Sequence, residues 1–391
     1  MKKRIIATAL VAIMVAIGFA GCGAPAGQPS GSAAPSGDTI KIGGLAPLTG
    51  DVSIYGIATN NGIKLAFDEI NAKGGILGKQ IEYIPYDEKG DATEAVNAYN
   101  KLVQNDKVVA IVGDVTSTPT IAVAQKAAED NMPIITATGT SDIITTKGEN
   151  VFRACFMDSF QGQLMASYAS EKLGAKTAAI LYSNSNDYST GLKDSFVETA
   201  ATCGLEIVAQ EAYADGDVDF KSQLTNIAAK NPDVLFLPEY YQDIALIAPQ
   251  SKEVGLKATL LGADGWDGVI AQVGADNAAS VEGAIFCNHY SAENPSEALA
   301  SFIKKYKDTY GEEPNSFAAL GYDAAYMLAK AIEDAGSTDS AAIIAAMSGM
   351  EFEGVTGNIK LDENRNAIKQ AAINKIESGA YKFVEFYQLA D

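Results

Sequence analysis

Hydrophobic and polar positions along the chain follow two alternating periods. Short runs rich in β-branched residues, such as residues 39–47 and 107–113, are typical of buried strands. Between such runs apolar residues recur at helical spacing, as in residues 55–75, which end in two glycines that favour a helix C-terminus. Strands separated by helices of this length predict right-handed βαβ crossovers and parallel sheets. Further strand patterns cover residues 79–88, 132–139, 177–183, 206–213, 233–239 and 258–264, and further helical patterns cover residues 92–105, 121–131, 160–174, 188–204, 220–231 and 241–255.

The alternation supplies more strands than one sheet comfortably holds. It pauses at residues 141–160 and then resumes, so we predict a boundary between two lobes there. Beyond residue 290 the pattern becomes helical, and the last stretch predicts short strands joined by turns. These helical segments are residues 296–311, 316–336 and 340–350, and the strand-rich stretch is residues 355–388.

The N-terminus has a different pattern, which is typical of secretion. Residues 1–21 combine a basic start, an apolar run and small residues, so we interpret them as a signal peptide. The segment "FAGCGAP" resembles a bacterial lipobox, in which Cys22 would carry the lipid, although Phe19 replaces the usual Leu. Cleavage of an ordinary secreted protein nearby is the alternative. Residues 23–38 are Gly, Pro, Ser and Ala with almost no large apolar side chain, which predicts a flexible linker after the lipidated Cys, over residues 22–38 in all.

Composition limits the classes of partner. The chain has 391 residues, enough for two domains, and 47% of them are apolar, so most of the chain should fold. The formal net charge is −20, from 49 acidic and 29 basic residues. Nucleic acid is therefore not expected as a partner, because phosphate binding needs a basic surface.

Motifs for catalysis, cofactors and metals are not found. His289 is the single histidine, and no G-x-S-x-G, phosphate loop or dinucleotide fingerprint follows a strand. We therefore expect a structural or surface role for His289, no cofactor and no enzymatic activity. Cys155, Cys203 and Cys287 are widely spaced and odd in number, which favours buried thiols over disulfides or a zinc site.

Two loops of the first half carry unusually many hydroxyls. The stretch "IVGDVTSTPT", residues 111–120, joins a strand to a helix. Ligands of open parallel sheets bind beyond the carboxyl ends of strands, and a helix start binds anions. Ser117 or Thr118 would suit the helix N-cap, and Pro119 would suit the first turn. Helix capping alone explains these residues as well, so both interpretations stay open. A second hydroxyl cluster, residues 135–142, ends the next strand and includes Gly139, whose backbone a ligand can approach closely.

Equivalent strand ends in the second half carry aromatic rings and carboxylates instead. One lobe suited to a carboxylate and another suited to a cation would together hold a zwitterion, because a buried charge needs a partner. We expect Asp264 to serve a ligand, whereas Asp267 is interpreted as a solvated loop residue. The other residues at these ends are Tyr188, Glu239, Tyr240, Tyr241 and Trp266.

The run "IKIGGLAPLTGDVSIYG", followed by "AFDEINAKGGILGKQIEYIPYDEKGDATEAVNAYNKLV", resembles the leucine/isoleucine/valine-binding proteins of ABC importers. The likeness continues through "VFRACFMDSFQG" to "SFAALGYDAAYML". It implies an α/β class and a type I periplasmic-binding-protein fold, in which a three-segment hinge joins two Rossmann-like lobes with parallel sheets. Lobe 1 would comprise residues 39–157 and 288–347, and lobe 2 residues 158–287 and 348–391.

The resemblance also implies a site and partners. Ser117 and Thr140 would hold the α-carboxylate and α-ammonium of an amino acid, with the residue 138 carbonyl and Asp264 on the ammonium. The implied partners are a small amino acid and a permease/ATPase complex, for a monomer that a lipid anchors to the membrane outside the cytoplasm. The candidate ligand-binding residues are Tyr55, Thr116, Ser117, Thr138, Gly139, Thr140, Tyr188, Glu239, Tyr240, Asp264, Trp266 and Phe317.

The sequence does not decide which side chain the ligand carries. Thr116, Glu239 and Trp266 depart from a purely apolar wall, so an aromatic or polar amino acid, or an amide, is an alternative to an aliphatic one. A sensing role on the same fold is the alternative to transport. Arg153 is interpreted as structural. The chain has only two other arginines, Arg4 and Arg365, so the Arg fork that a dicarboxylate would want is not expected.

Overall fold

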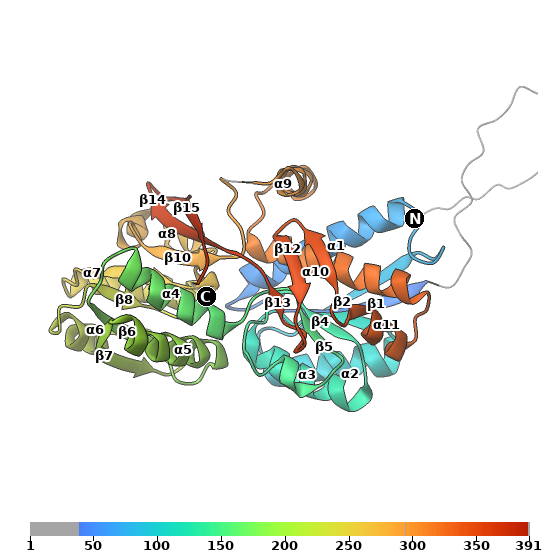
Figure 1. Cartoon of the computed structure of the whole chain (residues 1–391), viewed down its shortest axis with the longest axis horizontal. Coiled ribbons are helices and arrows are strands. Elements are labelled where there is room, and N and C mark those ends of the chain that lie inside the picture. Colours follow the sequence, from blue (N-terminus) through green and yellow to red (C-terminus); the bar gives the residue numbers. More distant parts are fainter. Residues whose placement is uncertain (1–38, 294, 390–391) are drawn as a thin grey trace, which may run out of the picture. The chain divides into compact units, whose positions relative to one another are not determined.

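The structure is a computed structural model that describes residues 39–293 and 295–389. The predicted signal peptide, the lipidation site Cys22 and the linker lie outside the described residues. Figure 1 shows the helices and strands with their labels.

The first lobe is built on a five-stranded parallel sheet in the order β2-β1-β3-β4-β5. Its central strands are short and every residue in them is buried, as expected where helices cover both faces. The strands are β1 Ile40–Ala46, β2 Ile81–Asp87, β3 Ala110–Val112, β4 Ile134–Thr136 and β5 Val151–Arg153. The helices are α1 Ser53–Ala72, α2 Ala92–Lys101, α3 Ser117–Asp130, α9 Glu297–Tyr310, α10 Ser316–Ala335 and α11 Ser340–Met347.

The second lobe contains a seven-stranded sheet in the order β15-β14-β10-β9-β8-β6-β7. Five strands are parallel, whereas β14 and β15 run antiparallel at one edge, so the sheet is mixed rather than purely parallel. Its strands are β6 Thr177–Ser183, β7 Glu206–Tyr213, β8 Val234–Phe236, β9 Thr259–Gly262, β10 Ile285–Asn288, β14 Ala371–Glu377 and β15 Ala380–Tyr387. Its helices are α4 Asp158–Glu171, α5 Asp187–Cys203, α6 Lys221–Ala228, α7 Tyr241–Glu253 and α8 Val269–Asn277.

A third, antiparallel sheet corrects the expected lobe boundary at residue 348. Strands β11 Glu351–Gly354, β12 Gly357–Leu361 and β13 Ala367–Ile368 bind the first lobe instead of the second. The backbone amides of Val355 and Thr356 donate to the Asp323 carboxylate on α10 at 2.8 and 2.9 Å. In Figure 1 these strands lie among first-lobe elements, while β14 and β15 lie beside β10. The pattern of short strands did not specify which lobe would receive them.

Three connections run between the lobes, which agrees with the expected type I fold. The first joins β5 to α4, the second follows β10, and the third joins β13 to β14. Each leaves one sheet and enters the other lobe, so residues 154–157, 289–293, 295–296 and 369–370 form the hinge region. The remaining boundaries of the two lobes stay predictions.

Helices α1 and α10 cross closely because each carries a glycine at the contact. A Cβ atom built on Gly62 would lie 1.9 Å from the carbonyl oxygen of Ala318, and one on Gly321 would lie 2.4 Å from that of Thr59. Larger residues would therefore separate the helices. The crossing places Tyr55 of α1 against Phe317 of α10, with ring centroids 4.0 Å apart.

The cysteines agree with the predicted buried thiols. Cys155 and Cys287 are buried, Cys203 is half-buried, and all three are unpaired within the described residues. In residues 39–293 and 295–389, none of the helices combines the length and the apolar character needed to cross a bilayer.

Candidate functional site

The hydroxyl-rich loops after β3 and β4 lie side by side, as parallel strands require. Helix α3 begins at Ser117, and Thr116 occupies the N-cap position without a side-chain bond to the helix. The expected capping by Ser117 or Thr118 is therefore wrong, although Pro119 does lie in the first turn. The Ser117 hydroxyl instead accepts a hydrogen bond from the amide of Ser141, at 3.2 Å, which ties the two loops together.

Two threonines of the second loop also form hydrogen bonds with the backbone of the first loop. The Thr138 hydroxyl donates to the carbonyl of Val115 at 2.7 Å, and the Thr136 hydroxyl donates to that of Asp114 at 2.6 Å. Thr136 also accepts from the amide of Gly139 at 2.8 Å. These bonds satisfy backbone groups in a buried place and hold the start of α3 in one geometry.

Arg153 holds this loop from behind. Its guanidinium is fully buried and donates to the carbonyls of Gly139, Thr140 and Ser141 at 3.2, 2.7 and 2.7 Å. The predicted structural role of Arg153 is thus confirmed, and Arg365 donates to the carbonyl of Thr145. Neither arginine lines the cavity described below.

The second lobe contributes a carboxylate. Asp264 follows β9 and is 2% exposed. The Tyr188 hydroxyl donates to its Oδ1 at 2.8 Å, and the imidazole Nε2 of His289 lies 3.1 Å from its Oδ2. The backbone amide of Asp264 donates to Oε1 of Gln161 at 3.0 Å. The carboxylate therefore has a fixed orientation.

Aromatic rings from both lobes form the walls. Tyr188 and Tyr240 of the second lobe stack with ring centroids 4.6 Å apart, and Phe317 stacks on Tyr55 in the first lobe. The Tyr55 hydroxyl donates to the carbonyl of Gly265 at 2.5 Å and accepts from the amide of Tyr241 at 3.1 Å. These two bonds join the first lobe to the second beside the site.

A narrow cavity of about 10 Å³ lies where these groups meet. That is about the room that one water molecule needs, so the lobes must separate before a larger ligand can enter. No cationic side chain lines it. Its lining residues are Val115, Thr116, Ser117, Thr138, Thr140, Tyr188, Tyr240, Asp264, Gly265 and Phe317.

Four of the twelve candidate residues do not line the cavity. Tyr55 and Gly139 lie directly behind it, against Phe317 and Arg153. Glu239 points into the second lobe, where its carboxyl accepts from the Ser189 hydroxyl at 2.6 Å. Trp266 is fully buried, and its indole N–H donates to the carbonyl of Leu237 at 3.0 Å. The expected influence of Glu239 and Trp266 on the pocket is therefore wrong, because side-chain direction is not visible in the sequence.

Asp267 differs from expectation, and of the structural and surface positions expected for His289 the surface one is excluded. Asp267 is 4% exposed, not solvated: its Oδ2 accepts from the amide of Ser316 at 2.9 Å and from the Asn288 amide group at 3.0 Å. His289 is buried against Asp264 and does not occupy a surface position. Both lie beside the hinge, which only the tertiary structure reveals.

Sequence reasoning missed Asp158, the first residue of α4. Its side chain is completely buried, and within the described residues neither carboxyl oxygen has a hydrogen-bond partner. Burial raises the pKa of Asp158 well above its ordinary value, and the nearby Asp264 carboxylate raises that pKa further. The two buried carboxyl groups, Asp158 and Asp264, thus interact electrostatically. The segment "VFRACFMDSFQG" contained the signal, since an acid opens a helix directly after a crossover.

Comparisons with known proteins identify the class. Residues 39–380 match the family model described as periplasmic binding protein. The Leu/Ile/Val-binding protein BraC3 of Rhizobium johnstonii is 33% identical over 346 residues, 87% of this chain and 92% of that protein. The chain therefore belongs to the periplasmic binding protein family, within the group of Leu/Ile/Val-binding proteins.

Solved structures agree with this assignment. The leucine-binding protein LivK of Thermotoga maritima is 35% identical, with a TM-score of 0.84 over 89% of this chain and 98% of that one. The branched-chain amino acid transporter substrate-binding protein LivJ of Streptococcus pneumoniae, solved with isoleucine, is 35% identical, with a TM-score of 0.84 over 90% and 99%. A solute-binding protein of R. palustris, solved with benzoate, is 25% identical, with a TM-score of 0.81 over 89% and 96%.

Proposed function

We propose that this chain captures a hydrophobic amino acid of the branched-chain type between its lobes and delivers it to an ABC importer outside the cytoplasm. The observation that carries the proposal is the pairing of a helix start with a buried carboxylate across one cavity. The N-terminus of α3, with Ser117, suits an anion, and Asp264 suits a cation. An amino acid zwitterion satisfies both.

The ligand's ammonium group would lie on the second-lobe side. Asp264 keeps the orientation that Tyr188 and His289 give it, and the unpartnered Asp158 supplies a second carboxyl nearby. Burying a carboxyl group without a partner costs free energy, so a cationic ligand group beside these carboxyl groups would stabilise the folded chain. The carbonyl of Thr138 and the hydroxyl of Thr140 complete the set of groups at the first lobe.

The acidic residues of the site also favour an amino acid over an aromatic acid, such as the benzoate bound in the R. palustris structure. Benzoate has no ammonium group, so it would leave the Asp264 carboxylate without a counter-charge, since the described residues that line the cavity include no cationic side chain. The aromatic walls favour an apolar side chain. The leucine and isoleucine named for the related proteins meet both conditions.

A thermal-shift screen of the common amino acids, with benzoate alongside, tests the proposal. Leucine, isoleucine or valine at about 100 times its dissociation constant should stabilise the chain by about 2.7 kcal/mol, a rise of several degrees in Tm. Calorimetry then gives the affinity. Stabilisation by benzoate, with no response to any amino acid, would overturn the proposal.

Capture should bring the lobes together. Micromolar binding of so small a ligand requires about 8 kcal/mol from few atoms, so nearly all of its surface must be buried. The bonds from Tyr55 to Gly265 and Tyr241 would close over it. Small-angle scattering should show a smaller radius of gyration on adding the ligand, and an unchanged radius would count against closure.

We also propose that Cys22 carries a lipid and that residues 23–38 tether a monomeric binding protein to the membrane. The lipobox-like "FAGCGAP" and the composition of the linker support this. In the native host, wild-type protein should partition with membranes and Cys22→Ala protein should not. Equal partitioning of both forms would favour ordinary secretion.

A further inference from the structure

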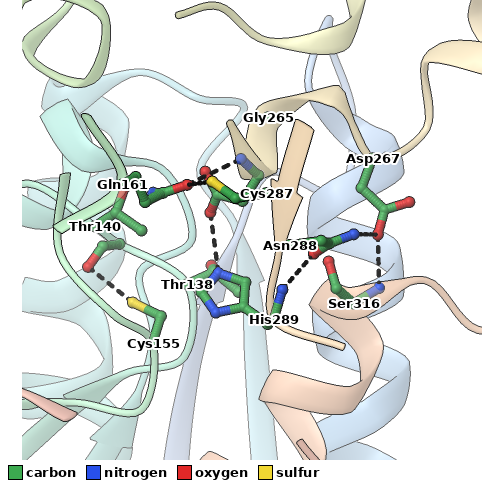
Figure 2. A network of polar contacts seen from close by, with 12 residues as sticks. Thr138, Thr140, Cys155, Gln161, Gly265, Asp267, Cys287, Asn288, His289 and Ser316 are labelled. Carbon is green, nitrogen blue, oxygen red and sulfur yellow. Dashed lines mark hydrogen bonds and ion pairs between the residues drawn. The ribbon is translucent and has the colours of Figure 1, made fainter. Parts of the chain in front are cut away.

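The second crossover between the lobes places two consecutive side chains on the loop that carries Asp264. Asn288 ends β10 and His289 follows it. Asn288 contacts Asp267 (Figure 2), and His289 contacts Asp264, three residues earlier on the same turn. The hinge therefore holds this turn at both of its acidic residues.

The contact at Asp267 extends into the first lobe. Its Oδ2 accepts from the amide group of Asn288 at 3.0 Å and from the backbone amide of Ser316 at 2.9 Å. Ser316 opens α10, and the next residue, Phe317, lines the cavity. The turn after β9 is thereby connected to the hinge and to a cavity wall of the opposite lobe.

Two contacts, one with Phe156 and one with Asp264, hold the side chain of His289. Its side chain has no exposed surface, and its ring stacks on Phe156 with centroids 3.8 Å apart and planes 22° apart. Phe156 belongs to the first crossover, so two hinge segments meet at the imidazole. The Nε2 atom lies 3.1 Å from Oδ2 of Asp264, and within the described residues Nδ1 has no partner.

The charge state of the ring follows from its surroundings. Burial lowers the pKa of His289 to about 4, although hydrogen bonding to Asp264 acts in the opposite direction and Lys369 adds to the lowering. The thiols of Cys155 and Cys287 nearby stay protonated, because burial raises the pKa of each, to about 12 for Cys155. At neutral pH a neutral imidazole facing a carboxylate donates from Nε2, and Nδ1 is left without a proton.

We propose that His289 is a positioning residue for ligand capture: from the hinge, its Nε2–H fixes the carboxylate of Asp264 in the orientation that receives the ammonium group of the ligand. The inference rests on the proposed function. The Tyr188 hydroxyl on Oδ1 and His289 on Oδ2 together leave the carboxylate little freedom to rotate. Fixing a binding group before the ligand arrives removes an ordering cost from binding.

Nitrogen NMR can observe this contact directly, because the chain contains a single histidine. In the full chain labelled with ¹⁵N-histidine and made without a histidine tag, the ligand-free spectrum should show a neutral imidazole with the proton on Nε2 at pH 7. Adding leucine or isoleucine should shift both ring resonances, since the ligand's ammonium group then shares Asp264. In Asp264→Ala the same addition should leave them unchanged.

Two substitutions separate positioning from packing. His289→Phe keeps a ring against Phe156 but cannot donate, so affinity for the amino acid should fall about tenfold or more, the usual effect of losing a hydrogen bond to a charged group. His289→Gln can still donate from its Nε2 and should stay within about threefold of wild type. Circular dichroism and thermal melts check that both variants fold.

The possible results separate a failure of the proposed function from a failure of the role proposed for His289. A wild-type chain that binds no amino acid in calorimetry overturns the proposed function. A chain that binds one with unshifted imidazole resonances, or with the proton on Nδ1, overturns the role of His289 alone. Wild-type affinity in a folded His289→Phe variant would do the same. If that variant fails to fold, the spectra of the wild-type chain still decide the question.

Discussion

The two walls of the cavity differ in charge. The first-lobe wall is neutral: the hydroxyls of Ser117 and Thr138 already bond to backbone groups, and helix α3 supplies its N-terminus. The second-lobe wall is acidic: Asp264 lines the cavity, and its charge raises the pKa of the buried Asp158, which has no hydrogen-bond partner within the described residues. The first wall is thus neutral, while the second presents a carboxyl group that suits a cation.

This difference shows where binding energy should be concentrated. Removing a neutral hydroxyl leaves a modest defect, because water or a neighbouring dipole replaces it at small cost. Removing a buried carboxylate that faces a ligand ammonium leaves an unpaired charge, which costs far more. Substitutions on the two walls should therefore have unequal effects, in the order given below.

Asp264→Ala should have the largest effect. The ligand's ammonium group would lose its oriented counter-charge, and we expect affinity to fall by about 2–5 kcal/mol, roughly 30-fold to several thousand-fold. Calorimetry measures the loss, and Asp276→Ala, an exposed acid of the same lobe, serves as the matched control. Equal affinities in the two variants would remove Asp264 from the site.

Tyr188→Phe should have the next largest effect. The ring keeps its stacking on Tyr240, but the hydroxyl that donates to Asp264 and accepts from the amide of Gly265 is lost. A hydrogen bond to a charged group contributes about 1.5–3 kcal/mol, so affinity should drop at least tenfold. A wild-type dissociation constant would show that Asp264 needs no support from Tyr188.

Ser117→Ala tests the neutral wall. We expect a loss of about 0.5–1.5 kcal/mol in amino acid affinity, because the carboxylate loses one neutral donor while the amides of α3 remain. The decarboxylated amine of the same ligand should bind wild type and variant equally. A larger loss than that of Asp264→Ala would reverse the comparison between the walls.

Glu88→Gln should change the pH dependence of stability. Glu88 and Asp114 are completely buried within reach of each other beneath the first-lobe loop, and burial raises the pKa of both. Above the ordinary carboxyl pKa of about 4, the unfolded chain releases protons that the folded state still holds. Stability therefore falls with rising pH until the folded-state pKa values, about 7 for Asp114 and about 10 for Glu88, are passed. The amide of Gln donates without titrating, so the fall in Tm between pH 6 and pH 9 should be smaller in the variant. Identical slopes would contradict a shared proton.

Thr118→Ala should have the smallest effect. Its hydroxyl donates to Asp187 of the second lobe at 2.9 Å, but the contact is exposed. Surface substitutions usually change stability by less than about 0.5 kcal/mol, so affinity should stay within about twofold. A tenfold loss would show that the mouth of the cleft, not only its walls, controls capture.

The sequence by itself determined the class and much of the neutral wall. Alternating strand and helix patterns predict two α/β lobes, because buried parallel strands and amphipathic helices leave distinct periodicities. Ser117, Thr138 and Thr140 lie at strand ends, where a parallel sheet always presents its loops to ligands, so their convergence followed from topology alone.

Only the tertiary structure decided the acidic wall and its support. Glu239 and Asp264 both follow second-lobe strands, yet one points into the lobe and the other into the cavity. Asp158 follows the first crossover and His289 lies in the second, and no local pattern brings them together. Burial, side-chain direction and contacts between distant segments depend on how the chain packs, and periodicity along the sequence does not encode them.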